Sequence, residues 1–318
     1  MSRPLRIGVI GSTSAVARLA VLPAIEASAR LELRATASLS DPAATYPSYE
    51  ALLQDDGVEA VYVPLPNSLH AEWTEKAAAR GKHVLCEKPL APTAGEAAFM
   101  ARCCAEAGVV LMEAYMTAFH PREQLLGEVV ASGRLGELLS ARAEFTGVLA
   151  RPDDHRYRPE MGGGALLDVG IYCLSPLLRA AGIEPASSEA VGVLAAAARR
   201  NERGVDTTFS GWLGLGNGRA GSFLCSFEAA ERQLLSIVGT AGRIDLERAF
   251  TPGQAETALV LTDRDGAVRS LEAEGVDPYQ AMLEHFAAVV AGEAPQQRPP
   301  AASVGLQRLL DRLREAAR

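Results

Sequence analysis

The chain has 318 residues, of which 48% are hydrophobic and 22% charged, and its formal net charge is -8. This length and composition indicate a globular protein with two domains of ordinary size. The acidic balance argues against nucleic acid or an anionic membrane surface as the main partner. We see no apolar run of about 18 residues that would predict a membrane span.

The cysteines and the N-terminal segment give information on the cellular compartment of the protein. The five cysteines are spaced without a C-x-x-C pair, and they are Cys86, Cys103, Cys104, Cys173 and Cys225. Such an odd set favours reduced thiols with packing roles over a disulfide frame or a zinc site, so we predict no metal. The chain runs from Met1 into a strand pattern without an apolar leader and cleavage site. We therefore expect a cytoplasmic protein.

Short apolar runs alternate with helical patterns over about the first 115 residues. The strand-like runs are Leu5–Ile10, Leu31–Ala37, Ala60–Pro64, His83–Cys86 and Val109–Met112. The helical stretches are Ala17–Ala29, Tyr49–Gln54, Ser68–Arg80 and Ala94–Ala107. This alternation predicts an α/β Rossmann-type domain over residues 1–118, with a doubly wound parallel sheet.

The alternation of strand-like runs with helical patterns ends after His120-Pro121. Helices are expected at Arg122–Ala131 and, after the triple glycine Gly162–Gly164, at Ala165–Ala181. The strand-like runs are Leu138–Val148, Ala190–Ala195, Thr207–Leu215, Arg219–Phe227, Gln233–Val238 and Arg243–Leu246. Successive strands without intervening helices predict an α+β domain over residues 119–318 with a mainly antiparallel, open sheet. A last amphipathic helix carries Val304, Leu306, Leu309, Leu310 and Leu313, and it could pack back on the first domain.

The first strand is followed by a glycine-containing turn that opens a helix. Gly8-Val-Ile-Gly11-Ser12-Thr13-Ser14-Ala15 stands where a dinucleotide pyrophosphate would meet backbone N–H groups. Thr13 replaces the second glycine of the G-x-G-x-x-G pattern, so an ordinary strand-to-helix turn is an equal alternative. The second strand ends in Ser38-Leu39-Ser40. The lack of an acid there favours NADP over NAD, the lack of an arginine opposes it, and Ser38 could simply start a turn.

Three segments follow the third, fourth and fifth predicted strands. They are Pro64-Leu65-Pro66-Asn67-Ser-Leu-His70, Cys86-Glu87-Lys88-Pro89 and Glu113-Ala-Tyr115. The carboxyl ends of parallel strands form the edge where open α/β sheets bind ligands. A lysine at that edge can donate to a substrate oxygen and stabilise charge that develops there during hydride transfer. By itself, however, the tripeptide Glu87-Lys88-Pro89 is more typical of a solvated loop.

With these neighbours included, the sequence resembles the glucose-fructose oxidoreductase, inositol dehydrogenase and rhizopine-catabolism (Gfo/Idh/MocA) family of nicotinamide enzymes. The resemblance covers nearly the whole chain. Its motifs are the opening glycine loop and the segments 66–70, 81–90, 113–121, 162–173 and 239–244. The Glu-Lys-Pro segment and the Gly-Gly-Gly, Asp, Tyr segment are the most specific.

The resemblance implies roles for individual residues. The catalytic set is Lys88, Asp168 and Tyr172, in which Lys88 contacts both nicotinamide and substrate and Tyr172 is the general acid and base. The four-residue step places Asp168 and Tyr172 on one helix face. Cofactor-binding residues are Gly11, Ser12, Thr13, Ser14, Ala15, Ser38, Leu65, Pro66, Asn67, His70, Glu87, Lys88 and Pro89. Substrate-binding residues are Lys88, Tyr115, His120, Arg156, Asp168 and Tyr172.

The implied function is hydride transfer between NADP or NAD and a carbinol or ketone of a sugar, polyol or dihydrodiol. The segment 242–252 fits both sugar dehydrogenases and nucleotide-sugar 3-ketoreductases. The alternative is a catalytically silent regulatory protein of the same fold that binds dinucleotide or sugar.

The sequence departs from the family in three places: Ala118 replaces the usual arginine, the glycine loop is one residue longer, and the stretch from Ser38 to Tyr49 is short. A homo-oligomer, dimer or tetramer, is expected because one face of the second sheet has no obvious helix to cover it.

Overall fold

The computed structural model describes residues 3–151 and 153–318. The chain divides into two compact units, each described here by itself. The first reaches to Phe119 and also contains Asp277–Val304, and the second contains His120–Val276 and Gly305–Arg318. The sequence analysis predicted one domain over 119–318, whereas the segment that returns to the first unit includes the start of the last helix, Pro300–Ala316. The reason is packing, because Leu283 and Phe286 of this returning segment are fully buried.

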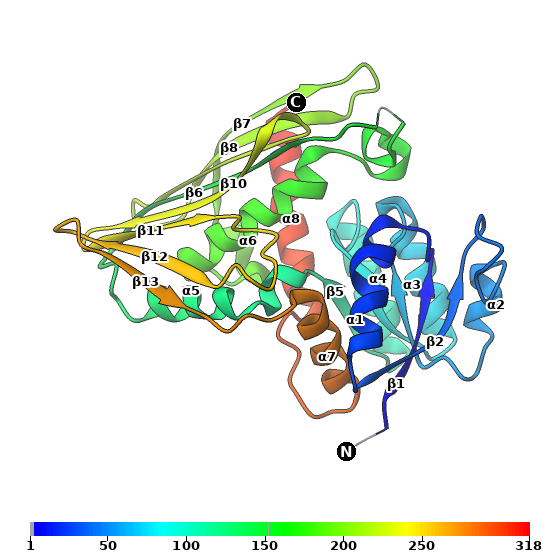
Figure 1. Cartoon of the computed structure of the whole chain (residues 1–318). Helices are drawn as coiled ribbons and strands as arrows, with labels where there is room; N and C mark the ends of the chain where they lie inside the picture. The colour runs from blue at the N-terminus through cyan, green and yellow to red at the C-terminus, as the bar shows by residue number, and fades with distance from the viewer. Residues whose placement is uncertain (1–2, 152) are drawn as a thin grey trace. The chain divides into compact units, whose positions relative to one another are not determined.

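The first unit is built on a five-stranded parallel sheet, as predicted (Figure 1). Its strands are β1 (Leu5–Ile10), β2 (Leu31–Ala37), β3 (Ala60–Val63), β4 (His83–Glu87) and β5 (Leu111–Ala114). The order is β2-β1-β3-β4-β5, so the winding direction reverses between β1 and β3. Ligands of such sheets bind outside the carboxyl ends of the strands at this reversal. The β1 and β3 ends are therefore the first places to look for a site.

Helices connect these strands. They are α1 (Leu22–Ala27), α2 (Tyr49–Leu53), α3 (His70–Ala79), α4 (Ala94–Glu106) and α7 (Pro278–Val290), with 3-10 turns η2 (Asn67–Leu69) and η3 (Met116–Phe119). A π-helical turn, η1 (Ala17–Val21), precedes α1. The α7 helix was not predicted.

The second unit is built on an eight-stranded sheet. Its strands are β6 (Leu138–Val148), β7 (Gly192–Arg200), β8 (Asp206–Gly214), β9 (Ala220–Ser226), β10 (Glu228–Gly239), β11 (Gly242–Glu247), β12 (Ala258–Asp263) and β13 (Val268–Glu272). Their order is β13-β12-β11-β10-β6-β9-β8-β7. Within the described residues, β6 and β9 pair in parallel and the other neighbours pair antiparallel. The prediction of a mainly antiparallel sheet is confirmed, although β12 and β13 were missed.

Helices pack on one face of this sheet. They are α5 (Pro121–Ala131), α6 (Ile171–Ala180) and α8 (Pro300–Ala316), with the 3-10 turns η4 (His155–Tyr157), η5 (Pro159–Met161) and η7 (Pro185–Ala190) and the π turn η6 (Leu166–Gly170). Figure 1 shows α5 and α6 on the same side of the strands. Phe209 and Leu213 of β8 are buried on that side, whereas Trp212 between them is 58% exposed on the other. Over residues 3–151 and 153–318, the face of the sheet that carries Trp212 is therefore not covered by a helix at this strand.

One apolar stretch needs a correction to the sequence analysis. The helical stretch Pro159–Ala180 contains an 18-residue window of mean hydropathy 1.4, long and apolar enough to pass for a membrane span. Of that window, 67% is buried inside the fold. A core helix is apolar for this reason, and α6 has buried side chains on most of its surface, including Leu174 and Leu177. Burial in the second unit accounts for its hydropathy.

Candidate functional site

The turn after β1 depends on a glycine. Gly11 has a φ of 75°, a left-handed conformation that glycine adopts readily. A Cβ added at Gly11 would lie 2.6 Å from Cδ2 of Leu65, in the loop after β3. The N–H groups of Gly11 and Ser12 donate to the carbonyl of Ala37, at 2.9 and 3.1 Å. The ends of β1, β2 and β3 are thus joined at this turn.

The helix that follows begins with backbone N–H groups that have no acceptor within the helix. Ser14 Oγ accepts the N–H of Ala17 at 3.2 Å, and the N–H of Arg18 donates to the Ser14 carbonyl at 3.1 Å. The N–H groups of Ala15 and Val16, in the first turn, have no acceptor within a helix. The positive end of the helix dipole adds to their attraction for an anion. These residues fit a pyrophosphate group, although Thr13 is less permissive than a glycine at its position.

Ser38 marks the end of β2 and is only 3% exposed. Its Oγ accepts the N–H groups of Ser40 and Asp41 at 3.2 and 3.1 Å. The turn-forming role that the sequence left open is therefore present. A contact between Ser38 and a cofactor ribose stays a prediction.

Lys88 follows directly on the last residue of β4. The phenol of Tyr62 donates to Oε1 of Glu87 at 2.6 Å, and the Lys88 N–H donates to Oε2 of the same carboxylate at 3.2 Å. The Lys88–Pro89 peptide bond is cis. Lys88 itself is half-buried, at the same sheet edge as the Gly11 turn. Glu87 thus shapes the backbone from which Lys88 projects.

His70 lies beneath these loops with no exposed surface. Its Nε2 is 2.8 Å from the Leu65 carbonyl, and its Nδ1 is 3.1 and 3.2 Å from the carbonyls of Pro89 and Leu90. Burial lowers the pKa of His70, and the three carbonyls oppose that shift. His70 thus ties the loop after β3 to the turn that carries Lys88, and its contact with the cofactor stays a prediction.

In the second unit, the triple glycine explains the position of Arg156. A Cβ on Gly163 would come within 2.3 Å of the Arg156 carbonyl, and the Gly164 N–H donates to that carbonyl at 3.0 Å. Arg156 Nε in turn lies 2.9 Å from Oδ2 of Asp168. Attraction to Asp168 raises the pKa of Arg156. The structure therefore brings together two residues that were predicted separately as substrate ligands.

The helix that carries Asp168 and Tyr172 begins at the partly buried carboxylate of Asp206. Asp206 Oδ2 accepts the N–H of Leu166 at 2.7 Å. Gly164 has a φ of 127°, and a Cβ there would lie 2.4 Å from Asp206 Oδ1. Burial raises the pKa of Asp206 to about 6, against the opposing effect of the Leu166 N–H. The sequence analysis missed Asp206, because an acid at the start of a strand gives no local signal.

Asp168 lies in the π turn η6, and Tyr172 follows in α6. Tyr172 is 6% exposed, and its ring contacts Phe145 of β6 with centroids 5.6 Å apart. A four-residue step that begins in a wide turn still returns to about the same side of the helix. Tyr172 therefore lies on the face toward β6, within an aromatic group that also contains Phe250.

Two further predicted substrate ligands are more buried than expected. His120 is fully buried, and its Nδ1 accepts the Arg122 N–H at 3.1 Å as the cap of α5. Tyr115 is 3% exposed, and the Arg298 guanidinium lies over its ring, 4.4 Å from the centroid. Their contact with substrate stays a prediction.

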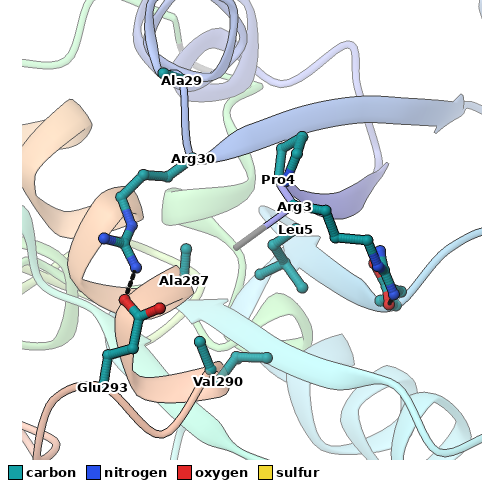
Figure 2. Close-up of a pocket in the computed structure, with 10 residues that line it drawn as sticks. Arg3, Pro4, Leu5, Ala29, Arg30, Ala287, Val290 and Glu293 are labelled. Carbon is teal, nitrogen blue, oxygen red and sulfur yellow. Dashed lines mark hydrogen bonds and ion pairs between the residues drawn. The ribbon is translucent and has the colours of Figure 1, made fainter. Parts of the chain in front are cut away.

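A cavity of about 610 Å³ lies at the opposite end of the parallel sheet (Figure 2). Its wall includes Leu5 and Ala287, and its rim carries the ion pairs Arg30–Glu293 and Arg3–Glu59. It adjoins the amino end of β1, about 20 Å along the strand from Gly11 at a rise of about 3.3 Å per residue. Ligands of this fold bind at the other edge. Among the described residues, no group of three or more His, Cys, Asp or Glu side chains could hold a metal ion.

Comparison with known proteins agrees with this geometry. The family model for the oxidoreductase family with an NAD-binding Rossmann fold matches residues 5–115, and the GFO/IDH/MocA C-terminal domain model matches residues 124–245. The chain is 38% identical to D-xylose 1-dehydrogenase (NADP(+)) 2 of Haloferax volcanii, over 98% of this chain and 97% of that one. It is 35% identical to dTDP-3,4-didehydro-2,6-dideoxy-alpha-D-glucose 3-reductase of Actinomadura kijaniata, over 93% and 91% of the two chains.

The structural comparison gives the same result. The 3-ketoreductase KijD10 of Actinomadura kijaniata, in complex with NADP and TDP-benzene, superposes with a TM-score of 0.90 at 31% identity, over 99% of this chain and 98% of that one. The resemblance stated from the motifs is confirmed, as is the assignment to nicotinamide-dependent oxidoreductases. The chain belongs to the Gfo/Idh/MocA family of NAD(P)-dependent oxidoreductases.

Proposed function

We propose that this enzyme transfers a hydride between NADP and a carbinol or ketone of a sugar, with Lys88, Asp168 and Tyr172 as its catalytic residues. The observation that carries the proposal is the Lys88 turn. It stands at the carboxyl end of β4, on the edge of the sheet where the helix after the Gly11 turn begins with the N–H groups of Ala15 and Val16. Buried contacts from Glu87 and His70 fix its backbone.

The protein residues would act on charge and protons. The nicotinamide, when bound, supplies or accepts the hydride. The Lys88 ammonium donates a hydrogen bond to the reacting oxygen and stabilises negative charge on it. The Tyr172 phenol gives a proton to that oxygen or takes one from it, depending on the direction of the reaction. Asp168, oriented by Arg156, accepts a hydrogen bond from a neighbouring substrate hydroxyl.

The substrate class rests on the relatives. One acts on D-xylose and another on a dTDP-linked keto-sugar, while relatives named trans-1,2-dihydrobenzene-1,2-diol dehydrogenase also match. A pyranose or a nucleotide-linked keto-hexose is therefore the proposed substrate, with polyols and dihydrodiols as alternatives. NADP is proposed over NAD because Ser38-Leu39-Ser40 offers no carboxylate to a ribose 2′-hydroxyl. Two relatives are also described with NADP.

The test is turnover with a panel of pentoses, hexoses, dTDP-keto-sugars and dihydrodiols, using NADPH and NADH in the reductive direction and NADP and NAD in the oxidative one. Lys88→Ala and Tyr172→Phe should each lower kcat at least a hundredfold, with the cofactor Kd changed less than threefold. Lys76→Ala is the matched control, because Lys76 is an exposed lysine paired with Glu72. Full turnover by Lys88→Ala would refute the mechanism.

The same panel tests the alternative of a silent regulatory protein. Dinucleotide binding without turnover on any substrate would favour that alternative. Equal affinity for NADPH and NADH, measured by nicotinamide fluorescence, would contradict the NADP preference.

We also propose a homo-oligomer, in which the face of the second sheet that carries Trp212 is covered by another copy of the chain. Trp212 and Leu194 are 58% and 68% exposed on the neighbouring strands β8 and β7. Burial of these two large apolar side chains against another copy would favour association. Light scattering that gave a monomer mass would contradict this, and Trp212→Glu should weaken the oligomer. Cytoplasmic location is proposed from the reduced cysteines and is tested by cell fractionation.

A further inference from the structure

Glu113 is the third residue of β5 and has a buried carboxylate, 2% exposed as a residue. Its Oε2 lies 2.8 Å from Nη2 of Arg298 and accepts the Ser303 hydroxyl at 2.9 Å. Its Oε1 accepts the backbone N–H of Leu90 at 2.9 Å. Leu90 is two residues beyond Lys88, so the Glu113 carboxylate is hydrogen-bonded directly to the turn that carries the catalytic lysine.

Arg298 supplies the counter-charge from a distant part of the sequence. It is 7% exposed, and its guanidinium also lies over the Tyr115 ring. The segment around it is fixed to the strand and loop that surround Glu113. Gln296 Nε2 donates to the Leu111 carbonyl at 2.7 Å, and Gln297 Nε2 donates to the Ala118 carbonyl at 3.0 Å. The guanidinium is thus held in place by its backbone as well as by its ion pair.

The Lys88 turn is held from two sides. His70 binds the carbonyls of Pro89 and Leu90, and Glu113 binds the N–H of Leu90. The two contacts differ in their electrostatics. The Glu113 carboxylate is stabilised in this buried place by the Arg298 guanidinium 2.8 Å away, since burying a charge without its partner is costly. Loss of Arg298 would therefore weaken the bond to Leu90 and leave His70 as the main constraint.

We propose that Arg298 and Glu113 are positioning residues for Lys88, which fix the direction of its side chain through the Leu90 N–H. The proposal deepens the assignment of Lys88 and rests on it. A displacement of about 1 Å at a reacting group costs up to a hundredfold in rate, so a residue that touches neither substrate nor cofactor can still set kcat. The sequence gives little indication of this role, because Arg298 lies in a Pro-rich link far from Lys88 along the chain.

The composition of the chain permits a direct test. It contains only three lysines, Lys76, Lys82 and Lys88. Protein labelled with 13C at the lysine ε-carbon therefore gives three lysine signals by NMR, and Lys88→Arg assigns the one of interest. Arg298→Met should shift the Lys88 signal, leave the Lys76 and Lys82 signals in place, and lower kcat at least tenfold. The NADPH Kd should change less than twofold.

Three variants complete the experiment. Arg298→Lys keeps the positive charge and should restore the Lys88 signal and most of kcat, beside one added lysine signal. Arg30→Met is the matched control, because it removes an exposed ion pair with Glu293 at the opposite edge of the sheet and should change neither readout. If Arg298→Met does not fold, Glu113→Gln provides the same readout. Glutamine is nearly isosteric with glutamate and keeps an oxygen that accepts the Leu90 N–H. The Lys88 signal should therefore shift in the same direction, but less.

The outcomes separate the two proposals. An unchanged Lys88 signal and unchanged kcat in both Arg298→Met and Glu113→Gln would overturn the positioning role, whatever Lys88 does. Equal loss in Arg298→Lys and Arg298→Met would also overturn it, because the charge would then be irrelevant. If Lys88→Ala keeps full turnover while Arg298→Met still shifts the Lys88 signal, the structural coupling holds and the catalytic assignment of Lys88 is what fails.

Discussion

Asp206 gives the most quantitative prediction, because its contacts and its acidity are both defined by the fold. Its carboxylate accepts the Leu166 N–H at the start of the helix that carries Asp168 and Tyr172. Burial raises its pKa from 3.8 to about 6. The folded protein therefore binds this proton more tightly than the unfolded chain. The contribution of Asp206 to stability is greatest below pH 3.8 and is lost as the pH rises to about 6.

The substitution Asp206→Asn removes the charge and keeps an oxygen for the Leu166 N–H. A shift of about two units corresponds to about 3 kcal/mol at neutral pH. The neutral amide forms a weaker bond to the N–H than the carboxylate does, which costs about 1 kcal/mol. The free energy of unfolding at pH 8 should therefore rise by about 2 kcal/mol. For a unit of this size, that is roughly a 5 °C increase in Tm.

The assay is denaturant unfolding of wild type and Asp206→Asn at pH 4.5 and pH 8. The difference between the two proteins should be smaller at pH 4.5, about 1 kcal/mol, than at pH 8, about 2 kcal/mol, because at pH 4.5 the folded carboxyl is largely protonated while the unfolded one is already largely ionised. Asp206→Ala leaves the Leu166 N–H without its acceptor and should be less stable than Asp206→Asn at both values. Equal differences between wild type and Asp206→Asn at pH 4.5 and pH 8 would refute the reasoning.

Three further predictions concern single sites. Gly164→Ala should destabilise the protein by at least about 2 kcal/mol in urea unfolding, because the left-handed backbone and the approach of Asp206 both exclude a Cβ; an unchanged midpoint would contradict this. Cys103 should react with a thiol reagent before the other four cysteines, which are buried, and mass mapping after brief labelling reads this directly. The pKa of Glu59 is lowered to about 2, chiefly by its bond to Arg3, so its stabilising contribution should be lost as the pH falls from about 4.5 to 2. Glu59→Gln should flatten that part of the acid unfolding curve, and an unchanged slope would count against the ion pair.

The sequence predicted the first unit well because its signals are local. Continuous apolar runs such as Ala60–Val63 have every side chain buried, and the glycines at the ends of α3 and α4 have positive φ values. A local signal also led to the prediction of Lys88 as a site residue, because it directly follows a strand. The missed elements lacked such signals. All of β13 except Leu271 is exposed, and α7 belongs to the first unit although 157 residues of the second unit, His120–Val276, precede it.

The sequence by itself determined the family and the class of reaction, since catalytic side chains and tight turns are encoded in short motifs. Only the tertiary structure decided what holds those residues in place. His70, which its motif predicts to be a cofactor ligand, forms a buried link between two loops that the motif does not indicate. Arg298 and Asp206 have no motif at all, because a counter-charge or a helix cap needs only proximity in space, which many sequence positions can supply.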